Sequence, residues 1–570
     1  MQAYAEHWWL SAASRGPYPH EAPHFSHAWA VGGTRTTSGR AVLHSDPQIP
    51  ITTPATLYEW HWKGATFAGR GAGFAGSPNL LIGSTGATAW GATALGIDQA
   101  DLFRLVVDPS GHPGQYQLDG VWLPWDVEQD ETILVAGEAP LVTNYRACVF
   151  GPVVTELVAD AHPGEEYAAK MVPLHDPAQD SFAGFVRMLR ADDVDELALA
   201  LAEVTWPSLN SIFAGADGRV GYWANGAAPV RSLSSPLGGR IAQDGSSLAF
   251  DWLDIVPHEL MPWVIAPADG FVLSANHMPV GAWYPIPVAI GTGSTGDTSR
   301  SRRLRERLAA EPVFEPAEVL AIHHDTVQPA RRDLVELGVF LRDVQGWPLA
   351  NDALRALAHL DDWWAAGARM TAEHPAVAVA WFLDLHFRAD EWPMLVAEFG
   401  GGDAGLQHFL KTQVAEIHAL PPVPLEAAAA AYVEASLARA WRAVSLAAGP
   451  PSSWAAWFEA NVLTAQLPQW TSLEGFPSLA PLVTFPVGPL TCTDGGTLLS
   501  QLGQCYSQDV EVGLADAALS LLPLGISEHD GAPYQLDQQP LWESESLHGS
   551  PSSLLATLAL GRWTVELLAY

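Results

Sequence analysis

Residues 24–50 have the sequence HFSHAWAVGGTRTTSGRAVLHSDPQIP. Two short apolar runs, HAWAV and AVLHSD, flank a segment rich in glycine, serine and threonine. Runs of this length that end in glycine, proline or aspartate are typical of β-strands joined by turns. We therefore expect a strand, a turn that contains glycine, and a second strand.

The same pattern continues to about residue 276, so the first part of the chain is predicted to be rich in β-strands. Further examples are the segments TLYEWHW, NLLIGS and RVGYWANG. In the first of them, Trp60 and Trp62 alternate with Glu59 and His61, as on a strand whose two faces differ.

The middle of the chain, from about 299 to about 450, is predicted to be helical. The segments SRRLRERLAA and PAEVLAIHHDTV carry apolar residues at helical spacing. LEAAAAAYVEASLARAWRAVSLAAG is rich in strong helix formers and ends at Gly449 and Pro450, which stop helices. Short strands resume from about Thr471. Strand-rich ends around a helical middle indicate one fold with a helical excursion.

The charge balance excludes several classes of partner. The 570 residues include 28 basic and 63 acidic side chains, a formal net charge of −35 at pH 7. Nucleic acids and anionic membrane surfaces are bound through lysine and arginine, so neither is expected as a partner. No stretch reaches the ~18 consecutive apolar residues of a membrane-spanning helix.

Other motifs do not indicate a catalytic, nucleotide-binding or metal-binding site. GAGFAG, with Gly71, Gly73 and Gly76, fits a nucleotide-binding pattern, but no helical pattern follows it, so we expect a flexible loop. The GxSxG nucleophile elbow is missing. His323 and His324 would point to different faces of a helix, which favours a surface or packing role over metal binding.

The segment at 24–50 resembles the nucleophile segment of the penicillin acylase family, through Ser26, Trp29, Gly32, Gly39 and Asp46-Pro47-Gln48. Four further blocks follow in the family's order: PNLLIGSTGATAWGATALGIDQADLF at 78–103, WPSLNSIFAGADGRVGYWANGAAPVR at 206–231, DWLDIVPHELMPWVIAPADGFVLSANHMP at 251–279 and GISEHDGAPYQLDQQPLW at 525–542. Each block is weak alone, but the ordered set covers nearly the whole chain after Phe25.

This resemblance implies an N-terminal-nucleophile (Ntn) hydrolase with an α+β fold. The family has a four-layer αββα core, in which two stacked antiparallel sheets lie between helices. The helical excursion at about 299–450 would be an insertion. Residues 26–570 would correspond to the family's β subunit, and residues 1–25 to a remnant of the α segment or linker peptide.

The family's nucleophile is an N-terminal serine, here Ser26, which becomes the N-terminus when the bond after Phe25 is cut. A serine hydroxyl needs a base, and the freed α-amine, with a pKa near ~8, can act as one. By resemblance, the backbone N–H of Ala94 and the side-chain amide of Asn210 stabilise the tetrahedral oxyanion. Gln48 falls beside the nucleophile, where its backbone is expected to position Ser26.

Three further residues have roles implied by the resemblance. Arg231 matches the arginine that orders the family's site, and a structural ion pair is the alternative. Ile49 and Ile82 fall at pocket-lining positions, which implies an apolar acyl group.

Asp98, Ala100 and Asp101 match the calcium loop of family members that bind this ion. Carboxylates and a carbonyl suit Ca²⁺. A further acidic residue of the family is replaced by Gly215 here. The resemblance therefore implies no organic cofactor and leaves two alternatives for the metal: one structural Ca²⁺, or none because this ligand is lost.

Together these features predict an amidohydrolase that cleaves an N-acyl amide through an acyl–Ser26 intermediate. Candidate substrates are β-lactam side-chain amides, acyl-homoserine lactones and other N-acyl compounds. The rival interpretation is a catalytically inactive or truncated relative without its α segment, because Phe25 and His27 stand where the family usually has glycine and asparagine. A separate α chain is then the expected protein partner.

The resemblance also implies a periplasmic or extracellular location. The N-terminal residues MQAYAEHWWLSAASRG show no basic start followed by an apolar run, so they predict no secretory signal. The sequence as given is therefore expected in the cytoplasm, unless an upstream segment supplies the signal.

Overall fold

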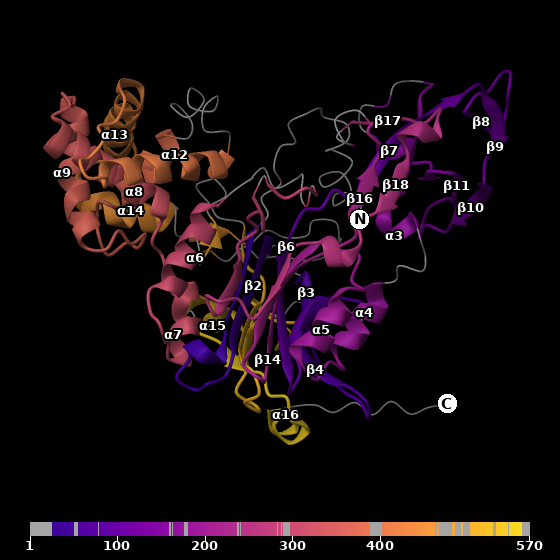
Figure 1. Ribbon diagram of the computed structural model, residues 1–570, viewed down its shortest axis with the longest axis horizontal. Helices are drawn as coiled ribbons and strands as arrows, with labels where there is room; N and C mark the ends of the chain where they lie inside the picture. The colour runs from indigo at the N-terminus through magenta and orange to yellow at the C-terminus, as the bar shows by residue number, and fades with distance from the viewer. Residues whose placement is uncertain are drawn as a thin grey trace.

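The computed structural model describes residues 25–50, 55–77, 79–158, 161, 164–175, 181–235, 239, 241–281, 283–286, 288, 297–387, 402–461, 464–466, 482–484, 492–493, 502–527, 532–544 and 546–560. The segment predicted as a remnant, 1–25, lies outside these residues except for Phe25, where the first strand begins. Figure 1 shows a central body of strands and helices, with a helical body on one side and a strand-rich body on the other.

The first central sheet contains the segment that opened the sequence. Its eight strands have the order β20-β1-β2-β25-β26-β27, with β24 paired to β2 and β23 paired to β24. They are β1 (Phe25–Val31), β2 (Val42–Pro50), β20 (Phe271–Ser274), β23 (Cys492–Thr493), β24 (Leu502–Gln504), β25 (Ser507–Glu511), β26 (Leu519–Leu521) and β27 (His548–Gly549). β1 and β2 are antiparallel, which confirms the predicted strand, turn and strand.

The second central sheet has seven strands, in the order β19-β15-β14-β6-β5-β4-β3. They are β3 (Leu57–Lys63), β4 (Ala68–Phe74), β5 (Ile82–Ser84), β6 (Thr88–Ala94), β14 (Leu209–Gly215), β15 (Val220–Asn225) and β19 (Trp263–Ile265). All its pairings are antiparallel. The second and third sequence blocks therefore lie side by side as β6 and β14.

The GAGFAG stretch is a strand up to Phe74, so the prediction of a flexible loop was wrong for Gly71 and Gly73, and only Gly76 lies in a turn. Gly71 and Gly73 belong to β4, which pairs with β3 and β5. Gly71 has φ +148, and a Cβ atom added to it would lie 2.1 Å from the carbonyl oxygen of Ile82. Glycine is needed here because the two backbones approach too closely for a side chain.

The two sheets stack face to face through small and aliphatic side chains. Fully buried residues at this interface come from both sheets: Ala28, Ala30, Leu43, Ala89 and Ile212. Because successive residues of a strand point to opposite faces, the same strands carry a second apolar face on their outer side.

Gly91 of β6 lets the sheets approach each other closely. A Cβ atom added to it would lie 2.5 Å from Ser45 Cβ and 3.5 Å from Ala28 Cβ. We expect Gly91→Ala to lower the free energy of unfolding by about 1–3 kcal/mol, because the sheets must move apart. Urea unfolding measures this loss. Gly86→Ala is the matched control, because a Cβ there meets nothing within 4 Å; an equal loss in both variants would contradict the prediction.

Two helices cover the outer face of the second sheet. Trp90 and Phe213 pack against α4 (Ser181–Met188) and α5 (Val194–Leu201). These helices interrupt the part of the chain predicted as strand-rich. Each has only eight residues, too few for a helical period to stand out from the surrounding strand pattern.

Helices also cover the outer face of the first sheet. Trp29 and Val42 pack against a cluster that includes residues of α6 (Ser299–Ala309) and α7 (Pro316–Leu320). The central body therefore has the layers helix, sheet, sheet and helix, as Figure 1 shows. The α+β fold class and the predicted αββα arrangement are confirmed.

The predicted helical insertion is also confirmed. After α6 and α7, which cover the first sheet, it contains the 3₁₀ helix η6 (Ala321–His324), α8 (Pro329–Phe340), α9 (Asn351–Ala365), α10 (Val377–His386), α12 (Gly402–Ile417) and α13 (Ala427–Ala448), and α14 (Trp454–Asn461) follows just past the predicted end. Its helices share a large apolar core, which Leu521, Leu524 and Trp542 near the C-terminal end of the chain also join. In the part of the chain that the structure describes, none of the helices combines the length and apolar character needed to cross a bilayer.

A second excursion is built from strands and lies on the other side of the central body (Figure 1). It contains β7 (Ala100–Val107), β8 (Gln115–Leu118), β9 (Val121–Pro124), β10 (Val127–Ile133), β11 (Leu141–Cys148), β12 (Gly151–Pro152), β13 (Glu166–Met171), β16 (Pro229–Arg231), β17 (Gln243–Asp244) and β18 (Trp252–Ile255). β7 begins six residues after the end of β6, so it connects this part to the stacked sheets.

Candidate active site

Ser26 lies near the start of β1, in the first central sheet. It is 6% exposed, and its Oγ accepts a hydrogen bond from the backbone N–H of Gln48 at 3.4 Å. This contact follows from the antiparallel register, which sets Ser26 opposite Pro47. The backbone of Gln48 therefore lies where the sequence prediction placed it, beside the candidate nucleophile.

His27 is held at the start of β1 by Asp46. Its backbone N–H donates to Asp46 Oδ1 at 3.0 Å, and its ring Nδ1 lies 3.1 Å from the same oxygen. Its Nε2 lies 3.5 Å from Nη1 of Arg300. Burial lowers the pKa of His27. The positive charge of Arg300 lowers it further, whereas Asp46 raises it by a smaller amount than burial lowers it. Nε2 of Gln48 lies 3.0 Å from Nδ1, so the ring faces N–H donors at both nitrogens, which fits a neutral imidazole better than a protonated one.

Asp46 also forms a buried pair with His44. Nε2 of His44 lies 3.6 Å from Asp46 Oδ2, and its Nδ1 lies 2.6 Å from Asp509 Oδ1. The ring stacks on Trp29, with centroids 4.1 Å apart. Burial alone would lower the pKa of His44, but Asp509 and Asp46 raise it to about 9. The ring is therefore an imidazolium between two carboxylates at neutral pH.

His323 packs on His44, with ring centroids 4.8 Å apart and planes at 8°. With Asp509, these histidines place three potential metal-binding atoms within 4.8 Å of one another. Because the nitrogen lone pairs lie in the ring planes, two nearly parallel stacked rings cannot both point at one ion. The packing role predicted for His323 therefore fits this geometry better than a metal site.

Stability should fall at alkaline pH because of His44. A raised folded-state pKa stabilises the fold most below about pH 6.5, and this contribution is lost as pH rises through about 9. We expect a loss of about 3 kcal/mol over this range. The titratable groups that interact with the ring are Asp46, Asp509, His27 and His323. Urea unfolding at several pH values measures the slope; His44→Gln should reduce it, and an unchanged slope would contradict the prediction.

Two asparagines meet at the carbonyl oxygen of Ala94. Nδ2 of Asn210 donates to it at 3.1 Å and to Thr93 Oγ1 at 3.1 Å, and Oδ1 of Asn210 accepts from Tyr222. Nδ2 of Asn276 donates to the same carbonyl at 3.0 Å. Asn210 therefore lies near Ala94 as predicted, but contacts within the sheet use both of its N–H donors. Asn276, from the fourth sequence block, is a second candidate.

Asn276 has φ +58, in the left-handed region that asparagine tolerates better than most residues. It follows β20, which pairs with β1. Its Oδ1 accepts a hydrogen bond from Arg300 Nη2 at 3.0 Å. The unusual backbone conformation thus directs the asparagine amide between Ala94 and Arg300.

The arginine beside Ser26 is Arg300, which the sequence prediction missed. Its Nη1 donates to the carbonyl oxygen of Ser26 at 2.9 Å. Arg231, which had been matched to the arginine that orders the site, instead forms the structural ion pair that was its alternative, with Asp98 and Asp101. The segment SRSRRLRER contains five arginines; α6 starts after its N-terminal cap at Thr298, and Leu304 and Leu308 pack it on the first sheet with Arg300 facing β1.

Ile49 and Ile82 lie in one apolar cluster between the two sheets, together with Leu57, Leu209, Cys505 and Tyr506. Cys505 is a free thiol whose Sγ donates to the carbonyl oxygen of Pro47, the residue opposite Ser26. The two isoleucines thus share an apolar environment close to the candidate nucleophile.

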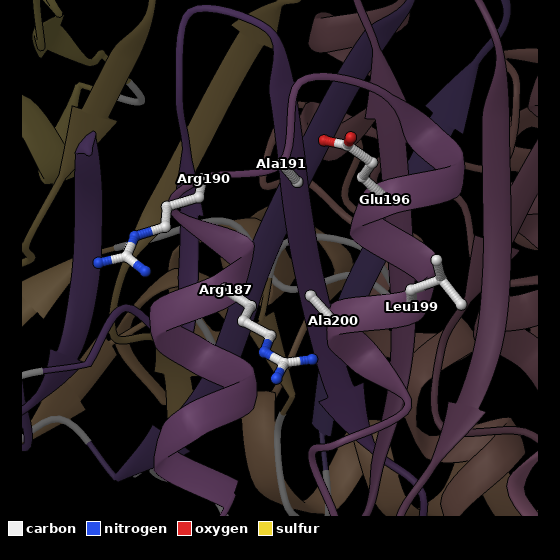
Figure 2. Close-up of a pocket in the computed structure, with 6 residues that line it drawn as sticks. All are labelled: Arg187, Arg190, Ala191, Glu196, Leu199 and Ala200. Atoms are coloured by element: carbon white, nitrogen blue, oxygen red, sulfur yellow. The ribbon is translucent and has the colours of Figure 1, made fainter. Parts of the chain in front are cut away.

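A groove elsewhere on the surface is lined by residues of α4, α5 and the turn between them. Figure 2 shows its lining side chains, which are Arg187, Arg190, Ala191, Glu196, Leu199 and Ala200. None of them belongs to β1, β2 or β6. Leu199 is strongly exposed, and the groove brings none of the candidate catalytic residues together.

The residues predicted to bind calcium do not present an open carboxylate site. Asp101 Oδ2 accepts from Nε of Arg231 at 2.8 Å, and Asp98 Oδ2 lies 3.1 Å from Nη2 of Arg231. Ala100 lies between them at the start of β7. Burial raises the pKa of Asp101 to about 7, although Arg231 opposes this. A guanidinium on both carboxylates disfavours Ca²⁺, so the donor set does not fit the ion.

Comparison with known proteins places this geometry in a family. The sequence model of the family described as penicillin amidase matches residues 3–553 of this chain. Acyl-homoserine lactone acylase QuiP of Pseudomonas fluorescens (strain Pf0-1) is 26% identical over 300 residues, which cover 53% of this chain and 36% of that protein. Penicillin G acylase of Escherichia coli is 28% identical over 331 residues, which cover 57% of this chain and 36% of that protein.

A solved structure shares the fold. The thermostable penicillin G acylase from Alcaligenes faecalis superposes with a TM-score of 0.71 at 20% sequence identity, over 96% of this chain and 100% of that chain. The fold is thus that of an Ntn hydrolase. The chain belongs to the penicillin amidase family, and it spans just over a third of the length of the two relatives named above.

Proposed function

We propose that this protein hydrolyses N-acyl amides, with Ser26 as the nucleophile once the bond between Phe25 and Ser26 is cut. The observation that carries the proposal is the set of contacts around Ser26. The Gln48 N–H donates to its Oγ, and Arg300 donates to its carbonyl oxygen. Arg300 also holds Asn276, whose amide reaches Ala94.

The freed α-amine of Ser26 is the proposed base. It removes the proton of Oγ as Oγ bonds to the acyl carbon, and it then passes that proton to the departing amine. Water next attacks the acyl–Ser26 ester, which releases the carboxylic acid and restores the hydroxyl. No histidine is required in either step, in agreement with a His27 ring that is bonded to Asp46.

The oxyanion is proposed to form between the backbone N–H of Ala94 and Nδ2 of Asn276. This choice replaces Asn210, because Asn210 uses both amide protons on Thr93 and Ala94. The guanidinium of Arg300 holds Oδ1 of Asn276 and thus orients its N–H donors. Such preoriented donors stabilise the charge that develops on the acyl oxygen.

The proposed substrate has an apolar acyl group, since Ile49 and Ile82 share an apolar cluster close to Ser26. Acyl-homoserine lactones and β-lactam side-chain amides both meet this description, and the names of the two relatives point to the same compounds. We also propose, from the family resemblance, that the protein works with an α chain and outside the cytoplasm.

Intact mass and N-terminal sequencing of the purified protein test the proposal first. A polypeptide that begins Ser-His-Ala-Trp, at Ser26, is expected, together with release of 4-nitroaniline from N-acyl 4-nitroanilides of graded chain length. A single uncut chain without turnover, alone or co-expressed with an α segment, would instead support the inactive relative.

A further inference from the structure

The loop and strand predicted to bind calcium converge with three other strands. Asp101 lies at the start of β7, Asp98 lies just before that strand, and Arg231 lies at the end of β16. Nη2 of Arg231 donates to the backbone carbonyl of Asp98 at 3.1 Å, in addition to its contacts with both carboxylates. One guanidinium therefore binds two carboxylates and a carbonyl, the oxygen types that Ca²⁺ prefers.

Lys170 adds a second positive charge to this cluster. It lies on β13, directly opposite Asp101 of β7, and both side chains are buried. Its ammonium pairs with Asp251, and it lies 5.3 Å from the ring centroid of Trp252. Nε1 of Trp252 in turn donates to Asp101 Oδ2. Side chains of β7, β13, β16 and β18 are thus joined by ion pairs and hydrogen bonds.

The cluster has nearly balanced charge without a metal. Asp98, Asp101 and Asp251 oppose Arg231 and Lys170, so the formal charge is −1 when all five are ionised. Binding Ca²⁺ would reverse this to +1 and would place a divalent ion beside a guanidinium. Repulsion between like charges in a buried site opposes that arrangement.

Gly239 closes over the ion pair. It has φ +92, and a Cβ atom added to it would lie 2.2 Å from Arg231 Nε and 2.4 Å from Asp101 Oδ1. Asp101 Oδ1 has no hydrogen-bond partner among the described residues, so an added cation would bind there first. The backbone of Gly239 already lies against this oxygen, whereas Ca²⁺ needs about six to eight oxygen ligands.

We propose that Arg231, supported by Lys170, takes the place of the structural calcium ion that the family resemblance implies. The guanidinium joins β7 to β16 permanently, so this part of the protein folds without metal. The inference does not depend on the proposed hydrolysis, because it concerns the stability of the strand-rich excursion rather than Ser26.

Calcium content and thermal unfolding of the full chain test the inference. After dialysis against a chelator and then against CaCl₂, the wild-type protein is expected to hold far less than one Ca²⁺ per chain. Its Tm should be the same with CaCl₂ as with the chelator, at equal ionic strength. About one bound ion per chain, or a Tm raised by Ca²⁺ but not by Mg²⁺, would overturn the proposal.

Arg231→Ala provides the converse test, since it leaves Asp98 and Asp101 without the guanidinium. We expect its Tm to fall by several degrees and to rise again with Ca²⁺. Arg219→Ala is the matched control, because it removes ion pairs with Asp195 and Asp217. Its Tm should be the same with and without Ca²⁺. A calcium-insensitive Arg231→Ala would also overturn the proposal. The wild-type measurement decides alone if this variant does not fold.

Discussion

Ser26→Ala is expected to abolish hydrolysis of N-acyl amides, with kcat/KM reduced on the order of 10⁴-fold or more. The variant lacks the oxygen that forms the acyl ester, and without Oγ no residue in the proposed mechanism takes its place. The measurement is release of 4-nitroaniline from N-acyl 4-nitroanilides, with intact mass recorded before and after substrate. An acyl adduct on the wild-type protein, absent from the variant, would locate the intermediate.

The control for this variant is Ser38→Ala, the same chemical change on the exposed turn between β1 and β2. It should keep wild-type turnover and wild-type chain cleavage. Ser26→Cys separates the two steps, because a thiol is also a nucleophile but differs in pKa and reactivity. Turnover by Ser26→Ala at the wild-type rate would exclude Ser26 as the nucleophile.

Asn276→Gly is expected to lower kcat by about 10²–10³-fold, the usual cost of removing one oxyanion donor. Glycine is the appropriate substitution because it accepts φ +58 without strain. KM should change little, since the donor acts mainly on the charge that develops in the transition state. Steady-state kinetics on the best 4-nitroanilide substrate give both constants.

Asn210→Ala is the matched comparison, because both asparagines contact the carbonyl of Ala94. This variant should lose about 1–3 kcal/mol of stability, since the hydroxyl of Tyr222 then loses its acceptor within a buried sheet. Its kcat should remain within about tenfold of wild type. The opposite result, a large loss of kcat only in Asn210→Ala, would show that Asn210 rather than Asn276 stabilises the oxyanion.

Sequence patterns predicted much of the architecture because they are local. Alternation at Trp60 and Trp62, the helical spacing over 299–450 and the strand, turn and strand at 24–50 each depend on residues close together in the chain. The short helices α4 and α5 were missed, since eight residues inside a strand-rich region carry too little periodicity. The glycines of β4 were misread, because the approach of β5 that requires them is a tertiary contact.

The sequence by itself determined the candidate nucleophile and its neighbours. Ser26, Gln48 and Ala94 lie in segments whose spacing carries the family resemblance, and the pairing of β1 with β2 places the Gln48 backbone on Ser26. Local strand pairing sufficed for Ser26 and Gln48 because β1 and β2 are joined by a short turn.

Only the tertiary structure decided which arginine and which asparagine accompany Ser26. Arg300 lies 274 positions from Ser26 along the chain, and Asn276 reaches Ala94 across 182 positions. The rotation of α6 and the left-handed turn after β20 set these contacts, and neither leaves a pattern in composition or spacing. Arg231 and its two aspartates show the same limit, because an arginine's partner depends on which strands meet around it.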